Sequence, residues 1–405
     1  MLRQARALAK HYRVVVVGFG ADPFRPDERE RIQWFPLDWS GSAVRWRQAK
    51  QWLYLRLGRL FPRCHELWYR QQHYWRYAWH FVQSARYRLI LCNDVDTLPL
   101  GIAATRWNRS CKVVLDMHEY ATREQDDGHE WLKVRRPLVT GIMRSMARRA
   151  HGTVTVSEAF VKLFQKEFGM KKPIVVHNAP DLIELPAKPA ATDGKIHLIH
   201  HGGACRQRRM ERMIEAMRHC GDRFVLHFML SGGEPDYREF LEKAAAELPP
   251  GRVVFEAPVP PDRVVAAVAR HDIGVYLLPD DNFNCRHAMP NKFFDFIVAG
   301  LPVAIGPSPA MAAVVKEHRI GWVGPDFSAE SFGALLAGLT DAQIAACRQA
   351  SLLARQKFNA ATETAKLVEL VKKLVPPGES SAASTAAATS PATGTGTGTA
   401  NAIAA

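Results

Sequence analysis

The chain has 405 residues, of which 47% are hydrophobic and 23% are charged, as in an ordinary globular protein. Its net charge of +14 favours acidic partners such as phosphorylated small molecules, anionic lipid or nucleic acid. Seven cysteines without a CxxC pair argue against a disulfide framework and a structural zinc site. Since neither a signal peptide nor a membrane-spanning apolar run is visible, we expect a cytoplasmic protein, soluble or peripheral on the inner face of the membrane.

The N-terminal half opens with a basic amphipathic helix, Leu2–Lys10, that leads into a β-branched strand, Val14–Gly18. A strand normally precedes such a helix in a doubly wound domain, so we expect the first strand to be missing, through a truncated reading of the gene or a true loss. Further strands are predicted at Leu89–Cys92, Lys112–Leu115, Thr153–Val156 and Pro173–Val176, and helices at Thr97–Trp107, Val134–Ala150 and Glu158–Phe168. Strands that alternate with helices predict a parallel sheet covered on both faces.

The same pattern restarts after a polar, proline-rich stretch, 181–195, which we interpret as a linker. Strands are predicted at Ile196–His200, Phe224–Met229, Arg252–Phe255, Ile273–Tyr276, Pro302–Ile305 and Gly321–Val323. Helices are predicted at Arg208–His219, Asp236–Glu247, Asp262–Ala269, Pro290–Ala299, Pro309–Glu317, Ser328–Gly338 and Asp341–Leu374. We therefore predict an α/β fold of two doubly wound, Rossmann-like domains, 1–180 and 196–375, that face a cleft, with the final helix packing back on the first domain. The composition of 376–405 predicts a disordered tail.

The most informative stretch is HAMPNKFFDFIVAGLPVAIG, His287–Gly306, in which a proline starts a helix. Asn291 and Lys292 fall in its first turn, where the positive end of the helix suits a diphosphate or a ribose. Asp295 follows one turn later on the same face, as a ribose-binding carboxylate would. An ordinary helix with a solvated Asn–Lys pair explains the same pattern equally well.

A second stretch, IHLIHHGGACRQRRMERMIEA, predicts a strand that ends at Gly202–Gly203 and a helix that begins near Arg208. Glycines allow close backbone approach, and a guanidinium near a helix N-terminus grips a diphosphate with two hydrogen bonds. Gly202, Gly203 and Arg208 are therefore candidates for phosphate contacts. A basic, solvated loop is the alternative interpretation.

Two patterns look like metal sites, and we expect neither to be one. Asp94 and Asp96 have the spacing of a DxD motif, but Asp96 or Thr97 also suits a helix N-cap, which we favour. His197 and His200 would point to opposite faces of a strand. No metal and no cofactor is therefore predicted.

Polar residues collect where two of the predicted strands end, and parallel α/β sheets bind ligands at that edge. Asp94 and Asp96 follow one strand, and His118 and Glu119 follow the next. His118 is suited to positioning or activating an acceptor hydroxyl, although a histidine at a strand end is often only a structural hydrogen-bonding group. Because position 122 is Thr, the HExxH zinc motif is excluded.

Taken together and in order, these segments resemble the GT-B glycosyltransferases of the family 4-like group over nearly the whole folded length. NDVDTLP and VVLDMHE are similar to strand-end motifs of that family's acceptor domain, and GTVTVSEAF and PIVVHNAP to the segments that follow. GG…RRMERMIEA and PNKFFDFIVAGLPV resemble the phosphate loop and the nucleotide-binding helix of its donor domain. Each motif alone is weak, whereas their order and spacing together are specific.

The resemblance implies transfer of a sugar from a nucleotide-sugar to a saccharide or lipid-linked acceptor, with retention and without a metal, in bacterial surface polysaccharide biosynthesis. It assigns diphosphate binding to Arg208, Lys292, Gly202 and Gly203, ribose binding to Asp295 and Asn291, and catalysis to His118, with Asp94, Asp96 and Glu119 on the acceptor side. The chain departs from the family pattern at His287, where a carboxylate usually stands, and at Gly203, where many members have Arg.

The segment 45–88 combines basic and aromatic residues, with ten Lys or Arg against one acid, Glu66, between Gly41 and Ile90. Such a segment suits an anionic membrane surface, where a lipid-linked acceptor would be found. A helical hairpin whose tryptophans pack in the core is the other interpretation. Nucleic acid is not expected as a partner, because no recognised binding motif accompanies the charge. A non-catalytic GT-B protein and a sugar-nucleotide epimerase remain alternative functions.

Overall fold

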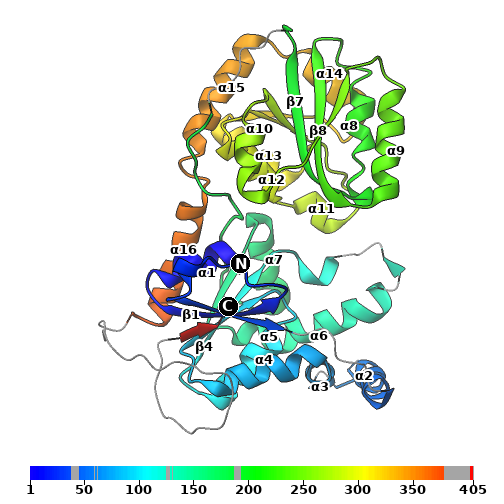
Figure 1. Cartoon of the computed structure of the whole chain (residues 1–405). Helices are drawn as coiled ribbons and strands as arrows, with labels where there is room; N and C mark the ends of the chain where they lie inside the picture. Colours follow the sequence, from blue (N-terminus) through cyan, green and yellow to red (C-terminus); the bar gives the residue numbers. More distant parts are fainter. Residues whose placement is uncertain are drawn as a thin grey trace. The chain divides into compact units, whose positions relative to one another are not determined.

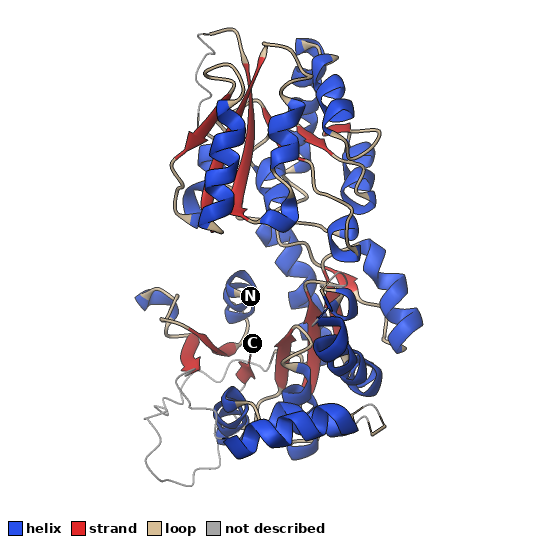
Figure 2. Cartoon of the chain, turned by 90° about the vertical axis from the view of Figure 1, so that its right-hand side faces the viewer, coloured by secondary structure: helices blue, strands red, loops and turns tan. Residues whose placement is uncertain are grey.

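The structure is a computed structural model that describes residues 1–37, 45–58, 60–61, 63–124, 128–129, 131–186, 193–377 and 402–404. The chain divides into two compact units. Unit 1 comprises Met1–Val156, Phe160–Val176 and Thr364–Ala405, and unit 2 comprises Ser157–Ala159 and His177–Glu363. Each unit contains a parallel sheet with helices on both sides (Figure 1 and Figure 2), which confirms the predicted doubly wound α/β architecture. Of the predicted linker, 187–192 lie outside the described residues.

The sheet of unit 1 has the strand order β2-β1-β13-β3-β4-β5-β6, and neighbouring strands in the described part of the chain pair in parallel. Its strands are β1 (Arg13–Phe19), β2 (Ile32–Leu37), β3 (Leu89–Asn93), β4 (Lys112–Met117), β5 (Gly152–Thr155), β6 (Ile174–Val175) and β13 (Ala402–Ala404). The sequence pattern did not reveal β2, which contains Pro36. Proline cannot donate to a ladder and is confined to edge strands, and β2 is indeed at the edge of the sheet.

Strand β13 occupies the position between β1 and β3 and pairs in parallel with both (Figure 1). No strand precedes the first helix, α1, in the described residues. Because β1 and β3 are not paired with each other, each has backbone N–H and C=O groups that need hydrogen-bond partners along the facing edge. Pairing with β13 provides partners for part of each edge. The rest of the predicted tail, 378–401 and 405, lies outside the described residues.

The helices of the N-terminal half surround this sheet. Three of them, α2 to α4, lie in the segment 45–88, for which a helical hairpin was one of the two interpretations. The set comprises α1 (Leu2–Ala9), α2 (Arg45–Leu57), α3 (Arg63–Arg70), α4 (His73–Ser84), α5 (Leu98–Trp107), α6 (Arg136–Met146) and α7 (Glu158–Phe168). A π-helical turn, Trp131–Arg135, leads directly into α6. In the described ranges, no helix combines the length and the apolar character that a membrane span requires.

The sheet of unit 2 has the strand order β12-β11-β10-β7-β8-β9. Its strands are β7 (Ile196–Ala204), β8 (Phe224–Gly233), β9 (Val253–Glu256), β10 (Ile273–Tyr276), β11 (Val303–Ile305) and β12 (Gly321–Val323). Two hydrophobic clusters cover it, and successive residues of β7 enter different clusters, Leu198 one and Ile199 the other. This alternation follows from the period of two of a strand, and it explains the apolar runs in the sequence.

The helices of unit 2 lie near the predicted positions, except that α8 is shorter than predicted, α11 was not predicted, and the end of the chain differs. They are α8 (Glu211–Ala216), α9 (Pro235–Ala246), α10 (Val264–Val268), α11 (Phe283–His287), α12 (Asn291–Val298), α13 (Pro309–His318), α14 (Ala329–Ala337) and α15 (Asp341–Ala354). The single final helix that we predicted is wrong, because α16 (Ala360–Leu374) begins after a break. At the break, the Asn359 side chain accepts a hydrogen bond from the amide of Thr362, and the amide of Ala360 donates to the carbonyl of Pro180.

Helix α12 is held in place by its own phenylalanines. Phe293, Phe294 and Phe296 are completely buried, and each such side chain contributes roughly 1.5–3 kcal/mol of burial free energy. With this face fixed in the core, the first turn of the helix is fixed as well. Asn291 and Asp295 lie on the remaining polar face, four residues apart.

Candidate functional site

The side chain of Lys292, in the first turn of α12, is buried, and Lys292 is only 8% exposed. Its Nζ lies 3.2 Å from Nε2 of His200 and 4.8 Å from the ring centroid of Tyr276. Nδ1 of His200 is 3.0 Å from the carbonyl oxygen of Val275. A carbonyl can only accept, so Nδ1 carries the proton and Nε2 is left to accept a hydrogen bond from the lysine.

The charge of Lys292 is destabilised by its surroundings. Burial, reinforced by repulsion from Arg208, lowers the pKa of Lys292 to about 7, although the charge of Asp295 partly offsets this. Burial and the nearby Lys292 charge also hold the pKa of His200 well below its ordinary value, so this imidazole is neutral. A buried, poorly compensated cation of this kind gains free energy when an anion binds beside it.

Arg208 shares the Tyr276 side chain with Lys292. It ends a 3₁₀ turn, Arg206–Arg208, that follows β7, and its Nη1 donates a hydrogen bond to Oη of Tyr276. The predicted helix start near Arg208 is therefore wrong, because α8 begins only at Glu211. Both cations nevertheless meet at one tyrosine at the end of the sheet, where parallel α/β domains bind ligands.

Gly202 and Gly203 lie within β7, which continues to Ala204 rather than ending at the glycines. Gly202 has φ = +118°, and a Cβ atom at this residue would lie 3.0 Å from Nζ of Lys292. Both the backbone conformation and the space beside Lys292 therefore require glycine. Gly203 is exposed and has no comparable crowding, since its nearest neighbour would lie 3.7 Å from a Cβ.

Asp295 lies beside a histidine to which the sequence pattern had given no role. Nε2 of His201 is 3.4 Å from Oδ2 of Asp295, and both side chains are largely buried. Burial and the charge of Lys292 lower the pKa of His201 to about 3, so its imidazole is neutral at physiological pH. Asn291, one turn before Asp295, is exposed. The same helical face thus presents an amide and a carboxylate next to the two cations.

In unit 1, the structure brings together His118 and Asp94, which follow neighbouring strands. The amide of His118 donates to Oδ1 of Asp94 over 3.0 Å, and the ring Nδ1 lies 3.3 Å from both carboxylate oxygens. Asp94 adopts φ = +62°, and its own amide donates to the carbonyl of Asp116. This turn directs the carboxylate of Asp94 toward the end of the next strand.

Asp116 lies on the other side of the His118 ring. Its Oδ2 is 3.6 Å from Nε2 of His118 and accepts a hydrogen bond from Nε2 of Gln4. Burial alone would lower the pKa of His118, but the hydrogen bond to Asp94 and the charges of Asp116 and Asp94 outweigh it and raise the pKa. Burial alone would raise the pKa of Asp94, but the hydrogen bonds and the charge of His118 outweigh the effect of burial and lower this pKa. His118 is therefore positioned between two carboxylates and favours its protonated form.

Asp96 has different partners from Asp94. Its carboxylate accepts hydrogen bonds from Oη of Tyr69 and from the guanidinium of Arg135. The N-cap of α5 is Thr97, one of the two expected cap positions, but its hydroxyl donates to backbone carbonyls instead of capping a helix amide. Within the described residues, Asp94 and Asp96 belong to no group of three metal-ligand side chains. Glu119 is exposed at the end of the same strand as His118.

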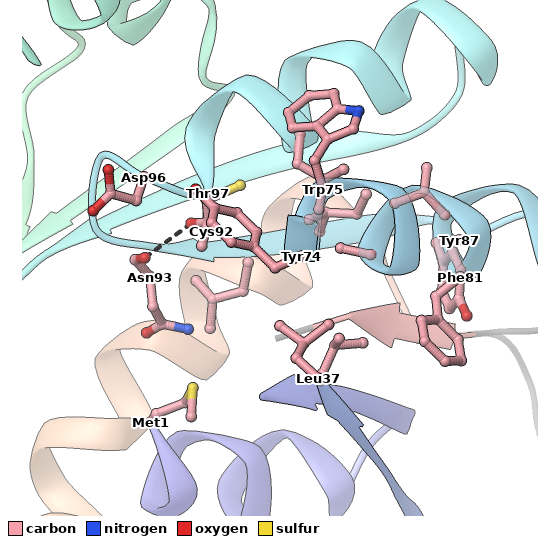
Figure 3. Close-up of a pocket in the computed structure, with 16 residues that line it drawn as sticks. Met1, Leu37, Tyr74, Trp75, Phe81, Tyr87, Cys92, Asn93, Asp96 and Thr97 are labelled. Carbon is pink, nitrogen blue, oxygen red and sulfur yellow. Dashed lines mark hydrogen bonds between the residues drawn. The ribbon is translucent and has the colours of Figure 1, made fainter. Parts of the chain in front are cut away.

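A cavity next to Asp96 is lined mainly by apolar side chains (Figure 3). Leu37, Tyr74, Trp75, Phe81 and Tyr87 form much of its wall, whereas Asn93, Asp96 and Thr97 give it one polar end. Figure 3 shows this polar end on the loop that follows β3, with the hydroxyl of Thr97 bonded to the carbonyl of Asn93. The cavity therefore suits a ligand with an apolar body and a polar head.

Several residues that contact the candidate site residues had been given no binding role from the sequence, and some of them belong to no recognisable motif. Tyr276 is the last residue of β10, a position at which parallel sheets collect ligand-binding groups, so the same rule used for Asp94 would have found it. His200 belongs to the HLIHH run, which was considered only as a metal candidate. Tyr69 and Arg135 lie on helical segments without a motif, and only the fold brings them to Asp96.

Residues 1–179 match the glycosyl transferase 4-like domain family. No curated protein sequence matches the chain. Among solved structures, it is similar to sucrose-phosphate synthase from Thermosynechococcus elongatus, with 14% identity, a TM-score of 0.68 and 92% of each chain covered. It is also similar to Anabaena HepE in complex with UDP and glucose, with 15% identity, a TM-score of 0.63, and 90% of this chain and 100% of HepE covered. A Staphylococcus aureus TarM variant, in complex with Fondaparinux, alpha-GlcNAc-glycerol and UDP, has 11% identity and a TM-score of 0.58 over 74% of this chain and 59% of its own.

Proposed function

We propose that this chain is a glycosyltransferase that moves a sugar from a nucleoside diphosphate donor to a saccharide or lipid-linked acceptor with retention of configuration. The match of residues 1–179 to the glycosyl transferase 4-like domain family and the GT-B fold support this proposal. The proposal rests above all on one observation in unit 2, the buried Lys292 that shares Tyr276 with Arg208. Two cations so close together need a strongly anionic ligand, and a diphosphate is the anion that a sugar donor supplies.

Lys292 and Arg208 would also act in the chemical step. When the glycosidic bond to the donor breaks, negative charge grows on the departing diphosphate. Preorganised cations in a buried site stabilise that developing charge, which lowers the barrier. In this proposal the two side chains fill the role that a divalent metal plays in other transferases, so we propose a metal-independent reaction. Asp295 and Asn291, on the adjacent helical face, would hold the ribose hydroxyls.

The acceptor side of the proposal rests on unit 1. His118, held between Asp94 and Asp116, would lie beside the reacting sugar and donate hydrogen bonds to it. The cavity beside Asp96 would receive the apolar part of a lipid-linked acceptor, while Asp96 and the exposed Glu119 bind its polar part. The exposed share of His118, 29% of its side chain, leaves it accessible to such a ligand.

A peripheral position on an anionic membrane, as part of surface polysaccharide assembly, belongs to the same proposal. Apolar side chains of the segment 45–88 are exposed at the end of α2 and just after it: Trp52, Leu53, Leu60 and Phe61. Cations accompany them, and the guanidinium of Arg56 stacks 3.7 Å from the ring centroid of Trp52. Trp75, by contrast, is buried and stacks on Trp79, so the core interpretation holds for part of the segment.

The decisive experiment is a binding and turnover assay. Thermal unfolding of the full chain is followed with nucleoside diphosphates of each base and their sugars, with UDP first because the HepE and TarM structures contain it. Binding at a hundredfold excess over Kd stabilises the folded state by about 2.7 kcal/mol. We expect a selective rise in Tm that Lys292→Met abolishes and that Lys316→Met, on the exposed side of α13, preserves.

Turnover then separates the proposed function from its alternatives. With the selected donor and a panel of saccharide and lipid-linked acceptors, a new glycoside with the anomeric configuration of the donor supports a retaining transferase. A free nucleotide-sugar with an inverted sugar centre would identify an epimerase instead. Tight donor binding without any product, across the whole acceptor panel, would contradict the catalytic proposal and favour a binding protein.

A further inference from the structure

Three potential metal ligands meet in unit 2 on elements that are far apart in the sequence. His227 comes from β8, Glu256 ends β9, and His271 lies in the turn before β10. Nδ1 of His227 is 2.7 Å from Oε1 of Glu256, and Nε2 of His271 is 2.9 Å from the same oxygen. The three ligand atoms all lie within 4.8 Å of one another.

These histidines are oriented by a second set of contacts. Nδ1 of His271 lies 3.2 Å from the carbonyl oxygen of Val268, and Nε2 of the same ring makes a hydrogen bond of 2.9 Å to Oε1 of Glu256. A bound metal ion would replace the proton between Nε2 and this carboxylate. Nε2 of His227 lies 2.8 Å from Nδ1 of His197. Metal-bound histidines almost always bond their other nitrogen in this manner, which fixes the tautomer and the ring direction.

The chain of contacts that begins at His227 extends through His197 to Asp193, outside the cluster of three ligands. Nε2 of His197 is 3.4 Å from Oδ1 of Asp193, so a carboxylate lies at the outer end of the His227–His197 pair. If Nε2 of His227 donates to His197, and His197 donates to Asp193, Nδ1 of His227 is left as a free lone pair. That atom is buried, lies 2.7 Å from Oε1 of Glu256 and has no assigned hydrogen bond. In this tautomer its lone pair faces the carboxylate, and a cation between the two would be bound by both.

We propose that His227, Glu256 and His271 bind a divalent transition metal, with Zn²⁺ as the expected ion. Two imidazoles and one carboxylate are a frequent ligand set for zinc, with a water in the fourth position. Bonds of about 2.1 Å in a tetrahedron place ligand atoms about 3.4 Å apart. The two distances to Glu256, 2.7 and 2.9 Å, are shorter than this value, so each histidine would move away from the carboxylate by about half an ångström to admit the ion. Glu256 is the most exposed of the three, at 31% of its side chain, and leaves access for the water.

The position of the cluster indicates a structural role. β9 is the edge strand of the sheet, and the metal would tie its last residue both to β8 and to the turn before β10. None of the three ligands is among the residues that surround Lys292. The proposed metal is therefore separate from the proposed sugar transfer, and it stabilises the unit that carries the donor residues.

The test uses the full chain without a histidine tag, stripped with a chelator and then titrated with Zn²⁺ and, separately, with Co²⁺. We expect one equivalent to bind, to raise Tm, and, for Co²⁺, to give the visible absorption of a tetrahedral nitrogen and oxygen site. Glu256→Gln and His271→Gln should each weaken Zn²⁺ binding by at least tenfold. His219→Gln, on an exposed histidine that only approaches Glu215, should leave it unchanged.

Each of the two ligand variants, Glu256→Gln and His271→Gln, tests the proposed metal site by itself. If one of them fails to fold, as judged by circular dichroism of the metal-free protein, the other is used. Zn²⁺ uptake with equal affinity in wild type and in both ligand variants would place the metal elsewhere and overturn the proposal. Absence of stoichiometric uptake by the wild type would overturn it as well. Nucleotide binding is measured in parallel, and it should persist in the metal-free protein.

Discussion

Nζ of Lys292 lies 3.2 Å from Nε2 of His200, while the other ring nitrogen of His200 is held by the carbonyl of Val275. The histidine is thus a neutral acceptor with a fixed orientation, and the lysine is a cation that has lost most of its hydration. This arrangement costs folding free energy in the absence of an anionic ligand. It should therefore be visible both in the stability of the chain and in the pH dependence of ligand binding.

Replacing Lys292 by Met should stabilise the unliganded chain at neutral pH. The folded pKa of Lys292 is about 7 and lies below its ordinary value of 10.5, so the unfolded state binds more protons between these values. The loss of folding free energy caused by the buried Lys292 charge is therefore largest at and below pH 7 and decreases as the pH rises toward 10. We expect a gain of roughly 2–4 kcal/mol at pH 7, measured by urea unfolding. A difference between the two proteins that is the same at pH 7 and pH 10 would contradict this interpretation.

Donor affinity should fall as the pH rises above about 7. A diphosphate binds best to the protonated lysine, so binding raises the pKa of Lys292 and takes up a proton. Above the pKa of the free protein, the affinity falls by up to about tenfold per pH unit. Calorimetry in buffers of different ionisation enthalpy measures the proton uptake directly. Lys292→Arg, which stays charged throughout, should bind without this pH dependence.

Gly202→Ala should weaken donor binding, whereas Gly221→Ala should not. Both glycines have positive φ values, +118° and +74°, so alanine strains the backbone at either position by about 1 kcal/mol. Only at Gly202 would the new methyl group approach the ammonium of Lys292, at 3.0 Å. We expect similar losses of stability from the two variants and a loss of nucleotide affinity from Gly202→Ala alone. Equal nucleotide affinities would show that the contact is unimportant.

Asp94→Asn should lower the pKa of His118, as followed by NMR of the imidazole. His118 has a higher pKa in the folded chain than in the unfolded chain, where it is near 6.5. Its protonation therefore stabilises the folded state fully below pH 6.5, and this stabilisation is lost as the pH rises through the pKa of the folded chain. The lowered pKa of Asp94 contributes stability above about pH 4, and this is lost as the pH falls through its folded value. Because Asp94 is half exposed, we expect the variant to lose about 1 kcal/mol or less near pH 6. An unchanged His118 titration would mean that Asp116 alone sets its charge.

Trp52→Ser combined with Leu53→Ser should reduce binding to vesicles that contain anionic lipid, and binding to neutral vesicles should be weak throughout. Both side chains are exposed on α2, and Arg56 of the same helix stacks on Trp52, so an anionic surface would meet apolar side chains and a cation together. Trp107→Ser is the matched control, because Trp107 is similarly exposed on α5. Co-sedimentation that is equal for anionic and neutral vesicles would contradict membrane docking.

The sequence predicted the buried strands well because short, fully apolar runs such as those of β3 and β4 are typical of strands covered on both faces. It failed where a local pattern was ambiguous or absent. The final helix looked continuous, since only the side chain of Asn359 and the amide of Ala360 mark the break at α16. Arg208 was placed on a helix because the basic run continues smoothly into α8, whereas the backbone first forms a 3₁₀ turn.

The candidate sites show the same limit. Asp94 and His118 were found because strand ends collect ligand-binding groups, and their pairing follows from two adjacent strands. Tyr69 and Arg135 reach Asp96 from helices whose packing no motif encodes. The proposed metal ligands depend on the register of β8 against β9, and no spacing in the linear sequence reports it.

The tight approach between Gly202 and Lys292 also has a consequence for inheritance. A side chain at Gly202 would crowd the ammonium of Lys292, so homologues that keep the lysine should keep the glycine. The reverse does not hold, because the backbone at Gly202, with φ of +118°, favours glycine whichever residue occupies position 292. The glycine should therefore be retained in more homologues than the lysine.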